Sequence, residues 1–178
     1  MKPAVSVLIP VYNSASTIES AVKSVLGQSL ADFEAVIVND GSDDDTPAIL
    51  DFIASLDPRV HVVHSPRRGI IHALNTGIAV CEGEFIARMD GDDICHPRRL
   101  EIQKSLMDSC PDISVCSSLV KIFPRPKLMG GLVRYEQWLN SLRTCEQIKR
   151  DMFVESPVAH PSVMVRRSEL IDMGGYQE

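Results

Sequence analysis

Short apolar runs alternate with amphipathic segments along most of the chain. Residues 5–9 form an apolar run rich in β-branched side chains, which is typical of a strand buried on both faces. Residues 18–26 instead repeat apolar side chains every three or four positions, the spacing of one face of a helix. The chain therefore opens with a predicted strand followed by a predicted helix.

The same alternation predicts the elements that follow. The predicted strands are residues 5–9, 33–38, 60–63, 85–89, 113–120 and 162–165. The predicted helices are residues 18–26, 46–56, 70–80, 97–109, 135–142, 145–153 and 168–173. Strands that alternate with helices through short links predict βαβ units, and hence an α/β fold with a Rossmann-like, mostly parallel sheet covered by helices on both faces. This regularity ends after Phe123, where the next residues have the composition of a loop.

Local signals mark several helix ends. Residues 16–19 and 144–147 both have the order of a capping box. Thr46 followed by Pro47 is typical of an N-cap and a helix-starting proline. Gly77 weakens the helix expected over residues 70–80, because glycine is a poor helix former.

The composition of the chain argues against several classes of protein. A chain of 178 residues that is 44% hydrophobic suits one domain with a real core, and a net charge of -6 argues against a broad nucleic-acid-binding face. The 5 cysteines are scattered without a C-x-x-C pair, so neither a zinc site nor a disulfide framework is indicated, and free thiols favour the cytoplasm. No apolar run approaches the roughly 18 residues of a membrane span, and Pro10 interrupts the N-terminal run too early for a signal peptide.

Polar clusters follow three of the predicted strands. They read "PVYN" after the first strand, "NDGSDDD" after the second and "DGDD" after the fourth. In a parallel sheet these clusters share one edge, and ligands of open α/β sheets bind there, where strand order reverses. The sequence therefore predicts a ligand site at this edge.

The acidic cluster at Asp90, Asp92 and Asp93 indicates the chemistry of the ligand. Three carboxylates this close repel one another unless water or a cation screens them. No glycine-rich phosphate loop occurs in the chain, and Mg²⁺ or Mn²⁺ can bridge carboxylates to phosphate oxygens. We therefore interpret the cluster as a site for a metal and a diphosphate. The alternative is a solvated polar turn that caps the next helix.

Other candidates each have a structural alternative. Tyr12 is placed to stack on a base or to pack in a turn, and Asp40 to bind a base or ribose or to form an Asx turn with Gly41. Arg67 suits a phosphate contact or a solvated loop. His96 is interpreted as an N-cap before the helix that starts at residue 97.

The motifs together resemble a bacterial family 2 glycosyltransferase with the GT-A fold. The segments that carry the resemblance are "SVLIPVYN", "VIVNDGSDD", "ALNTGIAVCEGEFIARMDGDD", "AHPSVMVRRSEL" and "GGYQE". They occur in order from about residue 5 to residue 178, and the similarity is weakest over residues 123–153.

The resemblance implies roles for particular residues. The nucleotide-sugar site would comprise Pro10, Val11, Tyr12, Asp40, Arg67, Asn75, Asp90 and Gly91. The metal would be held by Asp92 and Asp90, and Asp93 would lie beside the donor sugar as a catalytic residue. His160 would line the acceptor side.

The resemblance also implies the reaction and its partners. A sugar would pass from a nucleotide-diphosphate sugar, commonly a UDP-sugar, to a saccharide or lipid-linked acceptor hydroxyl, with Mg²⁺ or Mn²⁺ as cofactor. The expected course is inversion, in cell-surface polysaccharide or glycoconjugate synthesis. No nucleic acid partner is expected, and the protein could form a homo-oligomer. The expected location is the cytoplasm, including the periphery of the inner membrane.

Two other functions remain open. One is a non-catalytic fragment that binds nucleotide sugars, and the other is a nucleotidyltransferase. The nucleotidyltransferase would carry a glycine-rich turn with an arginine after its first strand, where this chain has "PVYN".

The end of the sequence lacks a motif that the family has. After the segment resembling "GGYQE", the family places an acidic pair that supplies the catalytic base. We therefore expect residues 1–178 to be a single GT-A domain truncated before that base, which would lie beyond Glu178.

Overall fold

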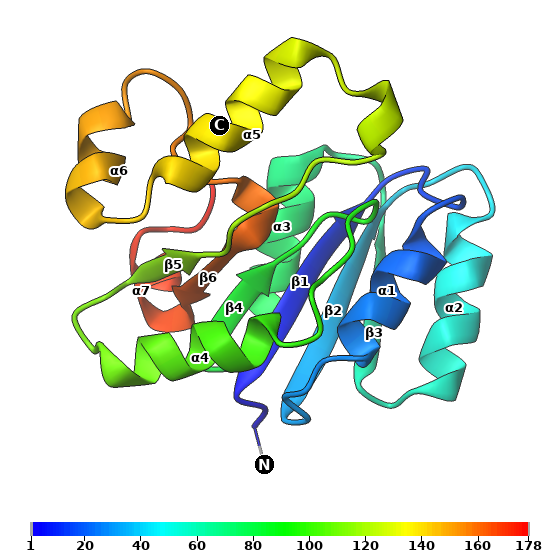
Figure 1. Cartoon of the computed structure of the whole chain (residues 1–178). Coiled ribbons are helices and arrows are strands. Elements are labelled where there is room, and N and C mark those ends of the chain that lie inside the picture. Colours follow the sequence, from blue (N-terminus) through cyan, green and yellow to red (C-terminus); the bar gives the residue numbers. More distant parts are fainter. Residues whose placement is uncertain (1, 178) are drawn as a thin grey trace.

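The computed structural model describes residues 2–177, so Glu178 lies outside the described residues. The chain forms an α/β fold around a six-stranded sheet (Figure 1). The strands are β1 Val5–Val11, β2 Phe33–Asp40, β3 Val60–Ser65, β4 Phe85–Arg88, β5 Val115–Ser117 and β6 Val163–Arg166. The helices are α1 Ile18–Leu26, α2 Thr46–Leu56, α3 Ile70–Val80, α4 Arg99–Ser109, α5 Gly130–Ser141, α6 Cys145–Asp151 and α7 Arg167–Asp172, with short 3₁₀ turns η1 Arg125–Lys127 and η2 His160–Ser162.

The strand order is β3-β2-β1-β4-β6-β5. The first four strands of that order are parallel, whereas β6 runs antiparallel to both β4 and β5. The predicted mostly parallel sheet is therefore confirmed. Strand order reverses between β1 and β4, and the polar turns after these two strands flank that point.

Helices cover both faces of the sheet, as predicted. Along β1, Val7 and Ile9 pack in a core cluster with α1, α2 and α4, whereas Leu8 faces the opposite cluster with α3 and α7. In Figure 1, α1 and α4 cross the near face and α3 lies behind the sheet. Alternate side chains of β1 therefore enter different cores, which explains its continuous burial.

The helix that contains Gly77 has the predicted bounds despite that glycine. A Cβ at Gly77 would overlap the Leu8 side chain of β1. The missing side chain therefore lets α3 approach the sheet closely, and this packing offsets the low helix propensity of glycine.

Some predicted boundaries are wrong. The strand predicted over residues 113–120 is limited to β5; the Ile113 N–H bonds back to the Cys110 carbonyl before it, and after it the Asn140 side chain donates to the Val120 carbonyl and accepts from its N–H. α5 begins at Gly130, inside the segment predicted to be a loop, and the N–H groups of Leu132 and Val133 bond to the Met129 carbonyl. The contact between Val120 and Asn140 joins positions 20 residues apart, and no local sequence period signals it.

Of the helix caps predicted from the sequence, some are present in the structure and others are absent. The capping box between Thr144 and Gln147 is confirmed. The one predicted over residues 16–19 is absent, and the backbone carbonyl of Ser14 accepts from the N–H groups of Thr17, the N-cap, and Ile18, the first residue of α1. α4 starts at Arg99 rather than residue 97, and its N-cap position is Arg98 rather than His96. The His96 side chain lies just before it, where Nδ1 accepts from the Arg98 N–H at 3.3 Å.

Candidate functional site

The turns that follow β1 and β2 are hydrogen-bonded to each other. Asn13 Nδ2 donates to Asp43 Oδ1 at 2.6 Å, and Asn13 Oδ1 accepts from the Asp43 N–H at 3.0 Å. The Ser14 N–H donates to Thr46 Oγ1 at 2.8 Å, and the Ala15 N–H donates to Asp44 Oδ2 at 3.1 Å. The acidic run after β2 therefore braces the turn after β1, in addition to preceding α2.

A cavity of about 400 Å³ lies at the point where strand order reverses. Its lining comes from the end of β1, the turn after β1 and the turn after β4, namely Pro10, Val11, Tyr12, Asn13, Ser14, Ser16, Thr17, Asp90, Gly91 and Asp92. Six residues predicted at separate positions of the nucleotide-sugar and metal sites thus line one cavity.

Gly91 lets the two turns approach. A Cβ built on Gly91 would lie 2.7 Å from Val11 Cγ1, closer than such atoms pack. The main chain of the acidic turn therefore packs directly against the end of β1.

We expect Gly91→Ala to destabilise the protein by about 1–3 kcal/mol, the usual cost of an overpacked site, and to weaken nucleotide binding by shifting the acidic turn. Urea unfolding measures the first effect. Gly130→Ala is the matched control, since a Cβ there meets open space at the start of α5. Equal unfolding midpoints for the two variants would show that the close approach at Gly91 has no energetic consequence.

Tyr12, Arg67 and Asp40 also come together at this edge. The Arg67 guanidinium carbon lies 4.0 Å from the centroid of the Tyr12 ring. Asp40 is buried at the end of β2, and its two oxygens accept from the N–H groups of Arg68 and Gly69 at 2.8 Å each. The carboxylate thereby holds the loop after β3 in place, and Arg67 with it.

Asp40 does not form the Asx turn that was the structural alternative for this residue. The local side-chain contact in this turn belongs to the neighbouring Asn39, whose Oδ1 accepts from the Ser42 N–H at 3.1 Å. The Asp40 carboxylate bonds to a loop 28 and 29 residues further along the chain. Asp40 therefore connects two of the site's turns.

The acidic turn distributes its carboxylates among different surroundings. Asp90 Oδ1 lies 2.6 Å from Nη2 of the buried Arg88, and Asp90 Oδ2 accepts from Arg88 Nη1 at 2.9 Å. Asp92 is exposed and Asp93 is half-buried. Burial raises the pKa of Asp93, and the negative charges of Asp90 and Asp92 raise it further. The turn therefore carries unbalanced negative charge that a cation would relieve.

The carboxylates of this turn fit a divalent cation whose remaining coordination positions are filled by a bound ligand. Within residues 2–177, no three His, Cys, Asp or Glu side chains are grouped as a ready-made metal cage. Mg²⁺ in nucleotide sites is commonly held by one or two carboxylates, with phosphate and water oxygens in the remaining positions. An exposed Asp92 beside Asp90, at the mouth of the cavity, matches that pattern.

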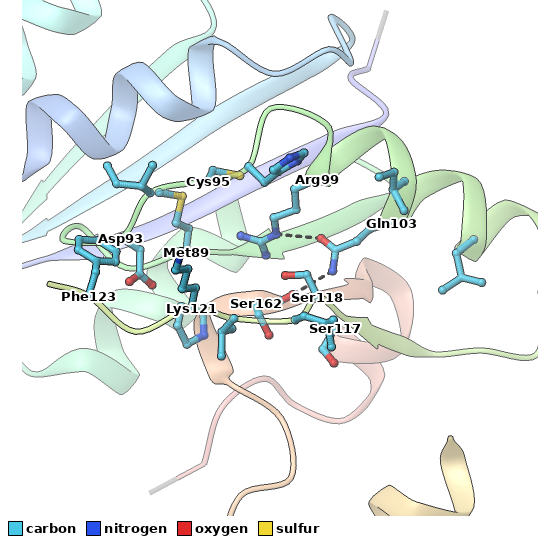
Figure 2. Close-up of a pocket in the computed structure, with 17 residues that line it drawn as sticks. Met89, Asp93, Cys95, Arg99, Gln103, Ser117, Ser118, Lys121, Phe123 and Ser162 are labelled. Carbon is cyan, nitrogen blue, oxygen red and sulfur yellow. Dashed lines mark hydrogen bonds between the residues drawn. The ribbon is translucent and has the colours of Figure 1, made fainter. Parts of the chain in front are cut away.

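Asp93 faces a second cavity, of about 600 Å³, on the other side of the acidic turn. Figure 2 shows Asp93 near Met89 and Phe123, and Arg99 hydrogen-bonded to Gln103 along one wall. Arg99 is buried, and its Nη2 donates to the carbonyls of Arg88 and Val163. The carboxylates of the turn thus line two cavities, with Asp93 in one and Asp90 and Asp92 in the other.

Asn75 and His160 lie with the C-terminal segment. Asn75 Nδ2 donates to the Tyr176 carbonyl, and its Oδ1 accepts from the Tyr176 N–H, both at 2.9 Å. The Tyr176 ring meets the His160 ring edge-on, with 5.2 Å between centroids. Partial burial lowers the pKa of His160, Arg88 lowers it further, and Asp90 opposes the change. Asn75 therefore positions the segment that packs against His160 beside the Arg88–Asp90 pair.

Arg88 is a site residue that the sequence interpretation missed. The available signal was a cation inside an otherwise apolar predicted strand, two positions before Asp90. Asn13 was also missed, and its left-handed backbone (φ 51°) is consistent with its place in a tight turn.

Comparisons with known proteins identify the family of the chain. The model of glycosyl transferase family 2 matches residues 6–174. The putative glycosyltransferase EpsH of Bacillus subtilis is 36% identical over 129 residues, which are 72% of this chain and 38% of that protein. Chondroitin synthase of Pasteurella multocida is 37% identical over 100 residues, 56% of this chain and 10% of that protein.

Solved structures give the same assignment of fold. The mannosyltransferase PcManGT from Pyrobaculum calidifontis, in complex with GDP-Man and Mn²⁺, superposes with a TM-score of 0.77 at 25% identity, covering 99% of this chain and 48% of that chain. S. aureus TarS 1-349 in complex with UDP-GlcNAc has a TM-score of 0.68 at 21% identity, covering 100% and 49% respectively. The GT-A fold expected from the sequence is confirmed.

This chain corresponds to only part of each of these relatives. This chain spans about half the length of the solved neighbours and 38% of EpsH. Within residues 2–177, no helix combines the length and apolar character needed to cross a membrane. Because the family model covers nearly all of the chain, this protein belongs to glycosyl transferase family 2.

Proposed function

We propose that this chain takes part in transferring a sugar from a nucleoside-diphosphate sugar to an acceptor hydroxyl, with UDP-sugars as the donor class and Mg²⁺ or Mn²⁺ as cofactor. The observation that carries the proposal is the cavity between the turns after β1 and β4, where aromatic, glycine and acidic residues meet at the switch point of the sheet. Such a crevice is where open α/β sheets bind nucleotides.

The base and ribose would lie at the Tyr12 side of the cavity. Tyr12 offers a ring already stacked by Arg67, and Asp40 holds the loop that carries Arg67. Pro10 and Val11 would form the adjoining wall. The carboxylate oxygens of Asp40 each retain a lone pair for a base or ribose donor.

The diphosphate would lie at the acidic turn. Asp92, with Asp90 beside it, would hold the cation, and Gly91 lets the main chain approach closely. A bound cation supplies positive charge against the leaving diphosphate. Asp93, which lines the second cavity, would stand beside the donor sugar where the acceptor approaches. His160, which packs against Tyr176 and directly precedes Pro161 of that cavity's lining, would lie on the acceptor side.

The reaction would proceed by displacement at the anomeric carbon. The acceptor oxygen forms the new bond as the bond to the diphosphate oxygen breaks, which inverts the configuration. The acceptor hydroxyl loses its proton to a general base. Named relatives include chondroitin synthase and hyaluronan synthase of Pasteurella multocida, which supports a role in polysaccharide or glycoconjugate synthesis.

Calorimetric titration of UDP tests the proposal. We expect binding in Mn²⁺ and a large loss of affinity in EDTA, because the acidic turn repels an unscreened diphosphate. Equal affinity in both buffers would remove the metal from the proposed site. Hydrolysis of a UDP-sugar under the same conditions separates an enzyme from a domain that only binds, and binding without hydrolysis or transfer would favour the latter.

A further inference from the structure

Residues 121–154 differ in charge from the rest of the chain. They contain seven Lys and Arg residues against three Asp and Glu residues, a net charge of +4, within a chain whose net charge is -6. Two of the basic side chains are neutralised in ion pairs, Arg125 with Glu136 and Arg150 with Asp151. The other five are exposed and make no ion pair within residues 2–177, namely Lys121, Lys127, Arg134, Arg143 and Lys149. This segment therefore gives an acidic protein a local positive surface.

The same segment exposes large apolar side chains. The exposed fraction is 91% for Phe153 and 75% for Val154, and Met152, Leu132 and Tyr135 are exposed as well. In Figure 1, α5 and α6 lie at the edge of the molecule with no other helix outside them. Single exposed apolar side chains are common, but a contiguous group of them marks a surface that binds a partner.

A hydrogen bond between α5 and α6 brings these apolar side chains together. Trp138 Nε1 of α5 donates to Oδ2 of Asp151, the last residue of α6, at 3.2 Å. Residues 152–154 directly follow and therefore leave α6 beside the middle of α5. On α5, the ring centroids of Tyr135 and Trp138 lie 5.8 Å apart, and Leu132 lies one helical turn earlier. We call the surface formed by Leu132, Tyr135, Trp138 and residues 152–154 the α5–α6 patch.

Basic side chains border the α5–α6 patch. Arg134 lies one helical turn before Trp138, and Lys149 lies in the last turn of α6. The loop of residues 121–127 carries two more exposed lysines, and it is fixed to α5 because its main chain and its arginine bond to the Glu136 carboxylate. Positive charges therefore surround an apolar centre.

We propose that the α5–α6 patch binds the surface of a membrane that contains anionic phospholipids. The apolar side chains would enter the boundary between head groups and acyl chains, and the bordering Lys and Arg side chains would contact the head-group phosphates. The rings of Tyr135 and Trp138 are amphipathic, which favours that boundary. This binding goes beyond sugar transfer and requires neither nucleotide nor metal.

The charges of the segment favour a lipid surface over a second copy of the chain. A two-fold dimer formed through the α5–α6 patch would bring the basic borders of both copies together, and like charges across an interface are unfavourable. Anionic head groups above apolar chains complement both the basic and the apolar side chains.

Sedimentation with lipid vesicles tests the proposal on the unaltered chain. We expect vesicles of phosphatidylcholine mixed with phosphatidylglycerol to bind the chain at least about tenfold more tightly than vesicles of phosphatidylcholine alone. Added salt should weaken the binding, because it screens the charges. Equal binding to both kinds of vesicle, or binding to neither, would overturn the proposal.

The single tryptophan of the chain reports which surface meets the lipid. Trp138 is half-buried within the α5–α6 patch. Brominated phosphatidylcholine in the anionic vesicles should therefore quench its fluorescence when the chain binds. Undiminished Trp138 emission from the vesicle-bound chain would mean that another surface faces the membrane, and the proposal would fail.

Two variants remove the two components of the surface. Lys127→Gln combined with Arg134→Gln and Lys149→Gln should weaken binding to anionic vesicles by about 100-fold, since each basic residue near such a surface contributes about fivefold. Phe153→Ser should weaken it at least about tenfold, the effect of withdrawing a phenylalanine from apolar burial. All four side chains are exposed, so both variants are expected to fold, which circular dichroism melts verify.

Matched controls carry the same exchanges elsewhere. Lys2→Gln combined with Lys23→Gln and Arg98→Gln removes three exposed charges outside the segment, and Phe52→Ser removes an exposed phenylalanine from α2. Both controls should bind anionic vesicles within about twofold of the unaltered chain, since charges away from the contact are screened by salt. If either patch variant binds like its control, the proposal is overturned.

Sedimentation velocity separates the remaining alternative. If the unaltered chain ignores vesicles and forms a dimer that Phe153→Ser dissociates, the α5–α6 patch joins two copies and the lipid surface is ruled out. A monomeric chain that binds anionic vesicles through this patch supports the proposal.

Discussion

Asp92→Asn is expected to fold normally and to lose the metal-dependent part of donor binding by more than about 100-fold, because replacing even a residue that only orients a metal ligand commonly costs 10–100-fold. The exchange keeps the size of the side chain and removes its charge. Asp92 is exposed, and so its replacement opens no hole in the core. Titration of UDP in Mn²⁺ and in EDTA measures the change.

A charge-matched control separates a local effect from one of net charge. Asp32 is exposed and immediately precedes β2, whose other end carries the site, so Asp32→Asn removes the same charge at the opposite edge of the sheet. We expect this control to bind UDP like the unaltered protein. An unaltered UDP titration in Asp92→Asn would mean that the acidic turn is only a solvated turn before α4.

Asp40→Ala is expected to reduce both stability and nucleotide affinity, whether or not metal is present. Hydrogen bonds to a charged group contribute roughly 1.5–3 kcal/mol each, and Asp40 accepts two from the loop after β3. Without the carboxylate, the N–H groups of Arg68 and Gly69 lose their acceptor and Arg67 is no longer held over Tyr12. Thermal unfolding without ligand measures the first loss, and UDP titration well below the melting temperature measures the second.

The two measurements distinguish the roles of Asp40. A variant that is less stable yet binds UDP within about 0.5 kcal/mol of the unaltered protein would reduce Asp40 to a residue that holds a loop. Asp40→Asn supplies a finer comparison, since it keeps one acceptor oxygen but turns an NH₂ group towards one of the two N–H donors. We expect its stability to fall between those of the unaltered protein and Asp40→Ala.

Much of the fold could be predicted because its signals are local. The bounds of α3 follow from helical spacing, and the buried strands β1 and β2 follow from apolar runs. The Thr144–Gln147 capping box depends on residues three positions apart, and it is present. The end of β5 could not be predicted in this way, since the backbone of Val120, inside the predicted strand, bonds to the side chain of Asn140 of α5, 20 residues away.

The candidate site, like the fold, could be predicted only where its signals are local. The position of the acidic cluster after β4 was readable from the sequence, because parallel strands place their following turns at one edge. The hydrogen-bond partners of the site residues could not be predicted from the sequence. Asn75 binds the main chain of Tyr176, 101 residues away, and no local pattern encodes that contact.

The sequence by itself determined the order of strands and helices, the edge of the sheet that carries the polar turns, and the residue types available there. These follow from periodicity and from chain direction, both of which act over a few residues. Only the tertiary structure decided that β6 runs antiparallel, that Asp40 holds the loop before α3, and that Asp90 is paired with Arg88 while Asp92 stands free of that pair. The physical reason is that a buried polar group must find a partner in three dimensions, and which partner it finds depends on how distant segments pack.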